Sequence, residues 1–361
     1  MLGRVVEVVE ADDRADPERA VAAARDLARD GVNLFCGVVP SQVALALSPV
    51  MPSLDAVLMT CAAASDKLTH EAFNPHFFRV TDHTYMRNRA QARLMAERYP
   101  EVSGWTAILP DVEYGRSAFA AFRDGLLEYY PALAGREPRI AAPVVARFGE
   151  TEFGPQIAEV MSGPAEGLFV AVYGGDAMSL YRQARVAGLS SKIKVLADST
   201  NEFLVPLEFG GSTPEHLWLA MTWYHGGYQN VPMSRRLYED HLRYTGNALP
   251  LGFVGTGHSA IHAYASAIRR CGQTSTGPVI AALEGLTFDT AKGPVTFRRE
   301  DHQAICDVGF IRIQSSSTEP GPGMLDYTRH DIAVAEFVRY GGADVIEPPS
   351  PGKPLVYRGR A

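Results

Sequence analysis

Short strand-like runs alternate with longer amphipathic segments along the first two thirds of the chain. In its first part these runs are Val5–Glu10, Val32–Cys36, Ala56–Thr60 and Phe77–Val80. Short apolar runs between helical segments are typical of strands that are buried on both faces of a parallel sheet. The alternation therefore predicts an α/β protein in which helices cover both faces of the sheet.

Two helix starts can be read directly from the residues in this first part. Asp16 is a favourable N-cap and Pro17 suits the first helical position, so a helix is predicted over residues 17–30. Ser41 would cap the next helix, Gln42–Val50. The N–H groups at the start of that helix favour a bound carboxylate or phosphate. The local pattern alone also fits a simple helix cap.

A second series of strands and helices runs from a predicted helix at Thr84–Tyr99 to a predicted strand at Leu217–Thr222. The chain has 361 residues, which exceeds the usual size of one domain. The repeated series and the length together predict two similar α/β lobes.

The last third of the chain is less regular. Residues 223–251 show no clear period, and helices are predicted beyond them at Gly257–Arg270 and Thr276–Glu284. Residues 315–323 are rich in Ser, Pro and Gly and are predicted to be a loop. The prolines within residues 348–354 predict an extended C-terminal segment on the surface.

Charge and hydropathy exclude some classes of protein. The net charge is −7 and the sequence pI is about 5.8, which argues against nucleic acid as the main partner. No apolar run approaches the roughly 20 residues needed to span a bilayer. The residues after Met1 lack the apolar stretch of a secretory signal, so we expect any export signal to lie outside this sequence.

Cysteine and histidine spacing gives no support for a metal site or for an enzyme. The four cysteines form no CxxC pair; Cys271 and Cys306 could be bridged if the fold brings them together. His258 and His262 share a helical face but lack the glutamate of a zinc-protease motif. No phosphate-binding loop or GxSxG elbow is present. We therefore expect a protein that is not an enzyme and that has no cofactor and no metal.

Several ordered segments together resemble one known family. The segments are Ala11-Asp-Asp with Asp16-Pro17, Gly37 with Ser41, Asn74-Pro-His-Phe-Phe-Arg79, Asp111 with Glu113-Tyr-Gly115, Phe153, Leu180–Leu189, Leu286-Thr-Phe-Asp289, Gly293-Pro-Val-Thr-Phe297 and His302-Gln-Ala304. In this order they resemble the periplasmic solute-binding proteins of the leucine/isoleucine/valine-binding type, the extracytoplasmic receptors of ATP-driven uptake systems.

The resemblance implies a fold of two doubly wound parallel-sheet lobes joined by three crossovers, with a ligand cleft between them. Lobe 1 would comprise residues 1–81 and 223–300, and lobe 2 residues 82–222 and 301–361. The implied partners are a small-molecule ligand, an amino acid or related small carboxylate, and an ABC permease in the membrane. The implied location is the periplasm, and the lobes would close over the ligand.

The family's ligand residues can be matched to this sequence one at a time. Ser41 matches the serine whose hydroxyl and N–H bind the ligand carboxylate, and Ala64 falls where a second such hydroxyl, of threonine, is usual. Ala62 matches a residue whose carbonyl accepts from the ligand ammonium, and Asp198 matches the acid that pairs with that ammonium. The alternative for Asp198 is a turn or helix cap.

Two tyrosines complete the implied site. Tyr114 and Tyr173 match aromatic positions that close over the ligand. Further along, Trp223, Tyr224 and Tyr228 could line the cleft opening or pack beneath a long loop, and the second is the more frequent fate of aromatic residues.

One departure from the family is large. Family members begin with a further strand and helix before the position that Val5 matches, and this first βα unit is absent from the sequence. In a sheet ordered 2-1-3-4-5 the missing strand is internal, and its loss would leave two strands with unpaired edges. We expect either that the native chain begins upstream of Met1 or that another segment fills the gap.

A second class of function stays open. Cytoplasmic sensors of amides or amino acids share this fold, and a chain without a signal peptide is compatible with them. Such a sensor would act through a change of lobe closure at a partner interface.

Overall fold

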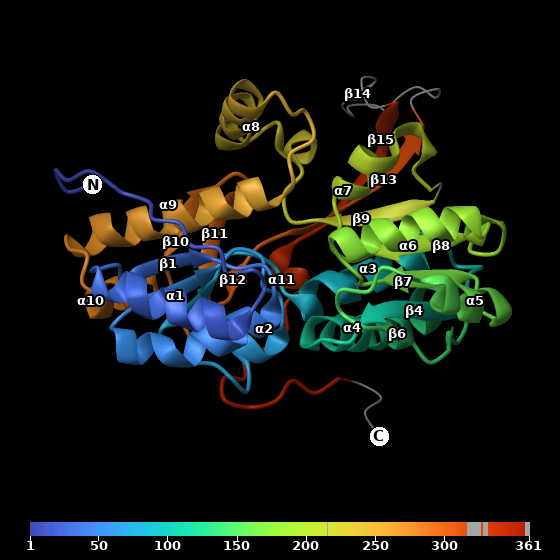
Figure 1. Ribbon diagram of the computed structural model, residues 1–361, viewed down its shortest axis with the longest axis horizontal. Coiled ribbons are helices and arrows are strands. Elements are labelled where there is room, and N and C mark those ends of the chain that lie inside the picture. The colour runs from blue at the N-terminus through green and yellow to red at the C-terminus, as the bar shows by residue number, and fades with distance from the viewer. Residues whose placement is uncertain (215, 316–325, 328–330, 358–361) are drawn as a thin grey trace.

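The computed structural model describes residues 1–214, 216–315, 326–327 and 331–357. Two α/β lobes lie side by side along the long axis (Figure 1). Lobe 1 contains both the start of the chain and the segment from α9 to β12, whereas lobe 2 contains the middle of the chain and the strands near its end. This arrangement confirms the α/β fold class predicted from the alternating pattern.

Lobe 1 begins with the helix that its cap predicts. The Asp16 carboxylate accepts hydrogen bonds from the N–H groups of Glu18 and Arg19, at 2.8 and 3.0 Å, which satisfies two donors that the helix itself leaves unpaired. The helices and parallel strands that follow are α1 Pro17–Arg29, β1 Leu34–Gly37, α2 Ser41–Leu47, β2 Val57–Thr60 and β3 Phe77–Arg79.

The rest of lobe 1 comes from the last third of the chain. It consists of α9 Phe253–Cys271, α10 Thr276–Leu283 and the antiparallel strands β10 Thr287–Thr290, β11 Gly293–Phe297 and β12 Ala304–Ile305. Tyr264 of α9 donates its hydroxyl to the carbonyl of Phe35 at 2.7 Å, which fixes α9 on β1. β12 pairs with β11 and so continues this part of lobe 1.

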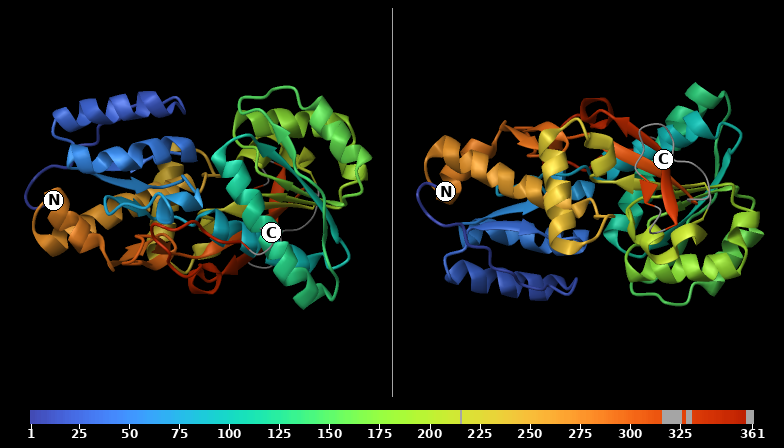
Figure 2. Two further views of the ribbon diagram at one scale, coloured as in Figure 1. Left: turned by 90° about the horizontal axis from the view of Figure 1, so that it is seen from below. Right: turned by 90° about the horizontal axis from the view of Figure 1, so that it is seen from above.

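Strands β2 and β3 of lobe 1 are buried on both faces, whereas β1 is partly exposed and the Cys36 side chain reaches the surface. Leu58 and Phe77 pack with α1 and α2, whereas Val57, Met59 and Phe78 pack on the face that α9 covers. Seen from below, α1 forms the outer layer of this lobe and α9 lies on the opposite side (Figure 2).

The strand predicted at Val5–Glu10 is not formed. Residues 5–10 have no strand assignment, and Val5 is 96% exposed. Among the described residues β1 pairs with β2 alone, and residues 5–10 pair with no strand. An extended segment without a neighbouring strand gains neither ladder bonds nor burial, which explains why the apolar pattern fails here.

Lobe 2 is built on a nine-stranded sheet in the order β14-β15-β13-β9-β8-β7-β4-β5, with β6 also paired to β4. β4 to β9 pair in parallel, and β13, β14 and β15 are antiparallel additions. The strands are β4 Gly104–Pro110, β5 Arg139–Ile140, β6 Val144–Ala146, β7 Gly167–Val170, β8 Val195–Asp198, β9 Leu217–Met221, β13 Val308–Ser315, β14 Asp326–Tyr327 and β15 Ile332–Tyr340.

Helices cover both faces of this sheet. Ile108, Val170 and Leu196 pack toward α5 and α6, and Ala107, Phe169 and Ala197 pack toward α3 and α4. The helices of lobe 2 are α3 Thr84–Arg98, α4 Glu113–Tyr129, α5 Gly154–Ser162, α6 Gly175–Val186, α7 Leu204–Phe209 and α11 Gly342–Val345. Shorter helical turns are η1 Ser48–Leu54, η2 Asp66–Thr69, η3 Tyr130–Ala134, η4 Leu189–Ser191, η5 Gly210–Ser212 and η6 His225–Tyr228.

Three crossovers join the lobes, after β3, after β9 and between β12 and β13. The second crossover contains α8 Pro232–Thr245, a helix that the sequence pattern did not reveal. Trp223 is 1% exposed and donates its indole N–H to Ser234 of α8 at 3.0 Å. Tyr224 and Tyr228 are also buried, so these aromatic residues pack beneath a long connection.

The remaining sequence predictions concern the cysteines and the end of the chain. Cys271 and Cys306 are free thiols, so the bridge that the sequence left open is not formed. The loop predicted over residues 315–323 lies outside the described residues apart from residue 315. The C-terminal residues 346–357 form no helix or strand, contain a turn at residues 351–353 and run beneath the two lobes (Figure 1). The prediction of a segment on the surface is only partly correct, since Glu347 and Tyr357 are buried. No described helix is both long and apolar enough to cross a membrane.

Candidate functional site

The carboxyl ends of the parallel strands in the two lobes face each other. Lys67 of lobe 1 pairs with Glu113 of lobe 2, with Nζ and Oε2 3.1 Å apart, and Ser65 donates to the same carboxylate at 3.5 Å. The lobes are therefore in contact, with the crevice between them closed. Crevices at the carboxyl ends of strands are where ligands bind in open α/β sheets.

Ser41 lies on the lobe 1 side of this crevice, in the first turn of α2. Its hydroxyl oxygen accepts a hydrogen bond from the N–H of Ser65 at 3.1 Å, and the residue is 1% exposed. Because the hydroxyl accepts this bond, its hydrogen remains to be donated. The N–H groups of Ser41 and Gln42 are first-turn donors without intrahelical acceptors.

The loop after β2 carries Ala62 and Ala64 and is held from both sides. Ala63 donates its N–H to the carbonyl of Val38 at 3.1 Å, and the carbonyl of Ala64 accepts from the N–H of Thr84 at 2.9 Å. Ala64 is 2% exposed and Ala62 is half-buried. The structure thus brings this loop beside Ser41, with a methyl group at position 64 where a hydroxyl would add a donor.

Tyr114 and Tyr173 meet on the lobe 2 side of the crevice. Their rings form a T-shaped pair with centroids 5.6 Å apart, and Phe148 lies 5.7 Å from the ring of Tyr173. The Tyr114 hydroxyl lies 2.8 Å from Ser199 Oγ, and Ser199 in turn donates to the Asn88 amide oxygen at 2.7 Å. Since Ser199 has one hydroxyl hydrogen, Tyr114 is the donor of this pair. The rings of Tyr114, Tyr173 and Phe148 form an aromatic wall, in which the Tyr114 hydroxyl already donates a hydrogen bond.

The hydroxyl of Tyr173 is not engaged in this way. It lies beside the Gln42 side chain of lobe 1, which acts to lower its pKa, although burial raises that pKa more strongly, to about 12. Neither the Tyr173 hydroxyl nor the Gln42 amide oxygen completes a hydrogen bond of good geometry, and both atoms are buried. Buried polar atoms almost always have partners. This pair across the lobes therefore marks a place where a ligand can supply one.

Asp198 forms its hydrogen bonds within lobe 2. It ends β8 and is fully buried, and each of its carboxylate oxygens accepts two hydrogen bonds from lobe 2. One oxygen accepts from the N–H groups of Thr200 and Asn201 at 2.9 and 2.8 Å, and the other from the Tyr181 hydroxyl at 2.7 Å and the Asn201 side chain at 2.8 Å. A ligand ammonium would have to displace one of these donors. The geometry matches the alternative that the sequence offered, a residue that holds a turn.

The turn at residues 198–201 connects the strand ends of lobe 2. Asn201 donates to the carbonyl of Val172 at 2.8 Å and accepts from the N–H of Gly174 at 3.1 Å, on either side of Tyr173. Through Ser199 the same turn holds Tyr114. Asn201 thus positions the aromatic wall, and sequence reasoning missed it, together with Gln42 and Phe148. Only the position of Gln42 directly after Ser41 offered a signal.

A separate group of buried charged residues surrounds Glu347 and includes His83 of the crossover after β3. The Glu347 carboxylate contacts His70 Nε2 at 3.0 Å and lies 3.2 Å from His83 Nε2, an ion-pair distance without hydrogen-bond geometry. His83 Nδ1 bonds Asp66 at 2.8 Å. Burial opposes ionisation of Glu347, but His83 and His70 hold its pKa well below the usual range. These four residues, with Tyr357 bonded to Asp66, anchor the C-terminal segment.

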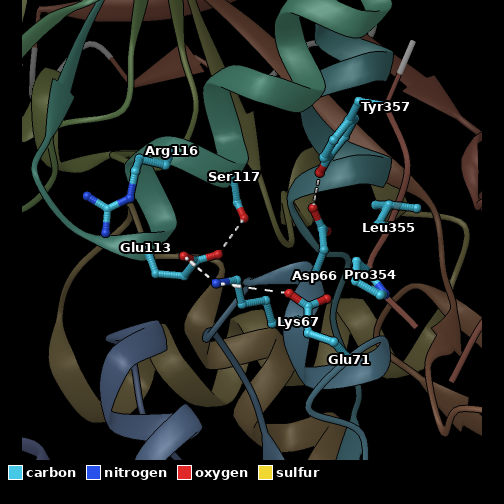
Figure 3. A pocket seen from close by; sticks show the side chains of 9 residues that line it. All are labelled: Asp66, Lys67, Glu71, Glu113, Arg116, Ser117, Pro354, Leu355 and Tyr357. Carbon is cyan, nitrogen blue, oxygen red and sulfur yellow. Dashed lines mark hydrogen bonds and ion pairs between the residues drawn. The ribbon is translucent and has the colours of Figure 1, made fainter. Parts of the chain in front are cut away.

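This segment closes one wall of a cavity of about 410 Å³ (Figure 3). The cavity lies between η2 of lobe 1, the start of α4 in lobe 2 and the C-terminal segment, and it contains none of the six residues matched to the family's ligand site. Its lining residues are Asp66, Lys67, Glu71, Glu113, Arg116, Ser117, Pro354, Leu355 and Tyr357. It therefore shares the Lys67–Glu113 pair with the crevice.

The two histidines at helical spacing do not form a metal site. His258 and His262 stack with ring centroids 4.2 Å apart, and burial lowers the pKa of His258 to about 4. Among the residues that the structure describes, no group of three or more His, Cys, Asp or Glu side chains is placed to hold a metal ion.

Comparison with known proteins agrees with this architecture. Residues 1–318 match a family described as periplasmic binding protein. The leucine-, isoleucine-, valine-, threonine- and alanine-binding protein of Pseudomonas aeruginosa is 23% identical over 296 residues, 82% of this chain and 75% of that protein. The family resemblance inferred from the ordered segments is thereby confirmed.

Solved structures show the same fold. An amino acid ABC transporter substrate-binding protein from Pseudomonas fluorescens superposes with a TM-score of 0.80 at 20% identity, covering 98% of this chain and 90% of that chain. A solute binding protein of an ABC transporter from Rhodopseudomonas palustris, solved in complex with 3,4-dihydroxy benzoic acid, gives a TM-score of 0.78 at 18% identity, covering 94% and 88%. Proteins of this fold thus include one solved with an aromatic acid.

Proposed function

Because the chain belongs to the periplasmic binding protein family, we propose that it is the extracytoplasmic solute receptor of an ABC uptake system and that it captures a small carboxylate by lobe closure. The ligand is an amino acid or a related small acid, and the receptor delivers it to a permease in the membrane. The names of the relatives, which include an amino acid-binding protein and a structure with an aromatic acid, support this range.

The observation that carries the proposal is the unsatisfied pair formed by Gln42 and Tyr173. The two residues come from different lobes, and each buries a polar atom without completing a hydrogen bond. A ligand that bonds to both would stabilise the closed arrangement over the open one, which is the condition for ligand-driven closure.

The carboxylate end of the ligand is assigned to lobe 1. Ser41 offers a hydroxyl hydrogen and, with Gln42, first-turn N–H groups, and the Ala62–Ala64 loop lies beside it. Tyr114 and Tyr173 cover the ligand from lobe 2. Hydrogen bonds to a carboxylate are strong when water is excluded, so closure and capture reinforce each other.

A thermal-shift screen tests the proposal. The purified full chain is heated with a panel of amino acids, aromatic acids, aliphatic acids, amides and urea, each in excess. A ligand at 100 times its Kd stabilises the folded state by about 2.7 kcal/mol, so a true ligand gives a clear rise in Tm. The absence of any rise with the carboxylates would contradict the proposal, and a rise with amides or urea alone would favour a sensor or receptor for neutral ligands.

Two further measurements bear on the finer parts of the proposal. Nuclear magnetic resonance of a bound compound after long incubation should show it unchanged, since a receptor performs no turnover. Stimulation of a reconstituted permease and its ATPase by the liganded protein would support the uptake role, whereas stimulation of a regulator would support sensing.

A further inference from the structure

We infer that Glu202 is a positioning residue that clamps the hinge between the lobes and favours their closed arrangement. It binds both ends of the second crossover, Thr222 and Gly252, and we call these three residues the hinge clamp. Because a hinge matters only if the lobes open and close around a ligand, the inference rests on the proposed function.

The two ends of the second crossover meet at the Glu202 carboxylate. One of its oxygens accepts from the N–H and the hydroxyl of Thr222, the first residue after β9, at 3.0 and 2.6 Å. The other oxygen accepts from the N–H of Gly252, the residue before α9. Since Glu202 belongs to lobe 2 and α9 to lobe 1, the bond to Gly252 joins the lobes where the chain passes from one to the other. The residues between the two ends, with α8, stand above the lobes (Figure 1).

The two ends lie so close together that position 252 has no room for a side chain. A Cβ on Gly252 would come nearer than 3.0 Å to the Thr222 hydroxyl oxygen, the Trp223 backbone nitrogen and the Glu202 carboxylate. The φ of Gly252 is −59°, an ordinary helical value that any residue adopts. The close approach of the crossover ends, and not the backbone conformation, is therefore what requires glycine here.

Glu202 holds these ends from an uncommon backbone conformation. Its φ is +50°, in the left-handed region that residues other than glycine seldom adopt, and the residue is 2% exposed. Burial raises the pKa of the Glu202 carboxyl, against the hydrogen bonds from Thr222 and Gly252, which lower it. Unfavourable backbone conformations persist where the surrounding structure holds them, and they gather at sites with a specific role.

The turn that carries Glu202 also positions the aromatic wall of the cleft. Ser199 accepts a hydrogen bond from the Tyr114 hydroxyl, and Asn201 holds the backbone on either side of Tyr173. A ligand that packs on these rings stabilises the turn, and the turn holds the hinge clamp in place. Capture of a ligand and closure of the hinge therefore favour each other, as linkage requires of coupled equilibria.

The same turn is also connected to the first crossover. The Ser199 carbonyl accepts from Arg87 of α3 at 3.3 Å, and Arg87 Nε donates to the Asp82 carboxylate at 2.6 Å. Asp82 lies in the first crossover, between β3 and α3. The turn thus contacts two of the three crossovers, so a rotation of one lobe against the other changes its surroundings on two sides.

Two variants break the hinge clamp without changing a residue of the cleft. Gly252→Ala inserts a methyl group between the crossover ends at a φ that suits alanine. Glu202→Gln replaces one acceptor oxygen by an NH2 group, so the N–H of either Thr222 or Gly252 loses its acceptor. The matched controls are Gly257→Ala on α9, where a Cβ meets nothing within 4 Å, and Glu159→Gln at an exposed position of α5.

Small-angle X-ray scattering of the full, ligand-free chain measures lobe opening. We expect a larger radius of gyration in both clamp variants than in the wild-type chain and the controls, because the closed arrangement loses an interlobe bond. Urea denaturation is measured alongside, since a residue that only supports the fold lowers stability and leaves the scattering unchanged. If Gly252→Ala does not fold, Glu202→Gln decides, and unchanged scattering of Glu202→Gln overturns the inference whatever its stability.

Calorimetry with leucine and with benzoate gives a second readout. In the clamp variants we expect the Kd of whichever probe binds to rise about ten-fold, since a smaller closed population lowers the apparent affinity in proportion. The controls should bind as the wild-type chain does. An unchanged Kd in Glu202→Gln overturns the inference and leaves the proposed function standing. If neither probe binds the wild-type chain, the scattering decides the inference, and the wider thermal-shift panel decides the proposed function.

Discussion

Two buried polar regions of this molecule differ in whether opposite charges face each other within them. Around Glu347, charges from lobe 1, the crossover after β3 and the C-terminal segment contact one another: His70, His83 and Asp66 form a chain of short contacts with the carboxylate of Glu347. In the crevice, the neutral side chains of Gln42 and Tyr173 bury polar atoms that complete no hydrogen bond. Glu347 Oε2 and His83 Nε2 also lack hydrogen-bond geometry, but there an ion pair at 3.2 Å takes its place. Both regions lie between segments distant in sequence, but the first joins charged groups of the protein whereas the second is where we propose that the ligand binds.

The difference teaches how to separate structural from functional polar residues. A buried group whose partners are all protein atoms has its role explained by stability, because breaking it leaves an uncompensated charge or dipole. A buried group without a protein partner has no such explanation, and a ligand is the natural candidate. By this criterion Asp198 belongs with Glu347, although the family resemblance had grouped it with Tyr173.

The largest expected effect is on the Glu347 cluster. In Glu347→Ala, the side chains of His70 and His83 and the guanidinium of Arg298 lose a carboxylate within 3.0 to 3.5 Å. Breaking a buried pair in this way costs about 3–5 kcal/mol of unfolding free energy, measurable by urea denaturation. The exposed Glu300→Ala is the control and should stay within about 0.5 kcal/mol. Equal stability of the two variants would refute the structural role of the cluster.

A smaller loss is expected at the turn after β8. Asp198→Ala removes the acceptor for four donors and should cost about 2–4 kcal/mol, because several buried donors are left unpaired at once. Asp289→Ala, at an exposed position of β10, serves as the control. A loss no larger than that of the control would mean that the turn is held by other contacts.

The charges around Glu347 predict that stability depends on pH within a definite range. The folded-state pKa of Glu347 lies below its ordinary value of 4.5, so its stabilisation is present above pH 4.5 and is lost as the pH falls through the folded pKa. Burial alone would lower the pKa of His83, but Glu347 and Asp66 raise it above 6.5; its stabilisation is present below pH 6.5 and is lost as the pH rises through the folded pKa.

The pH range in which Glu347 and His83 stabilise the fold can be measured by comparing two proteins. The stability difference between the wild-type chain and Glu347→Gln should be largest between about pH 4.5 and 6.5 and should shrink on either side, with a maximum of about 1–3 kcal/mol. Denaturation curves at a series of pH values measure it. A stability difference that does not vary with pH would mean that the ionisation of Glu347 and His83 does not contribute to it.

The smallest effect on stability, but the sharpest test of the comparison, comes from the neighbouring tyrosines. Tyr114→Phe removes a hydroxyl that donates to Ser199 and should cost about 1 kcal/mol. Tyr173→Phe removes a hydroxyl that completes no bond, so it should leave the ligand-free protein unchanged or slightly more stable, while weakening the ligand found in the screen by about ten-fold. If Tyr173→Phe destabilises the ligand-free chain as much as Tyr114→Phe does, the contrast between the two regions fails.

Several parts of the fold followed from the sequence because they depend on neighbouring residues. The cap at Asp16, the strand-like runs from Val32 onward and the spacing of ordered segments predicted α1, the parallel strands and the family. The same reasoning failed at Val5–Glu10, where the apolar pattern is present but no neighbouring strand is. It also missed α8, whose start at Pro232 has no side-chain cap and whose exposed surface gives little apolar signal.

The amino-acid sequence by itself determined the α/β class, the two-lobe family and the segments that meet at the crevice, since local periodicity, capping and motif order are written along the chain. Only the tertiary structure decided which polar groups are already paired. Asp198 finds its donors in Tyr181 and Asn201, Glu347 meets His70 from 277 residues away, and Gln42 faces Tyr173 across the lobes. Hydrogen bonds form through short distances in space, and residue order does not state those distances.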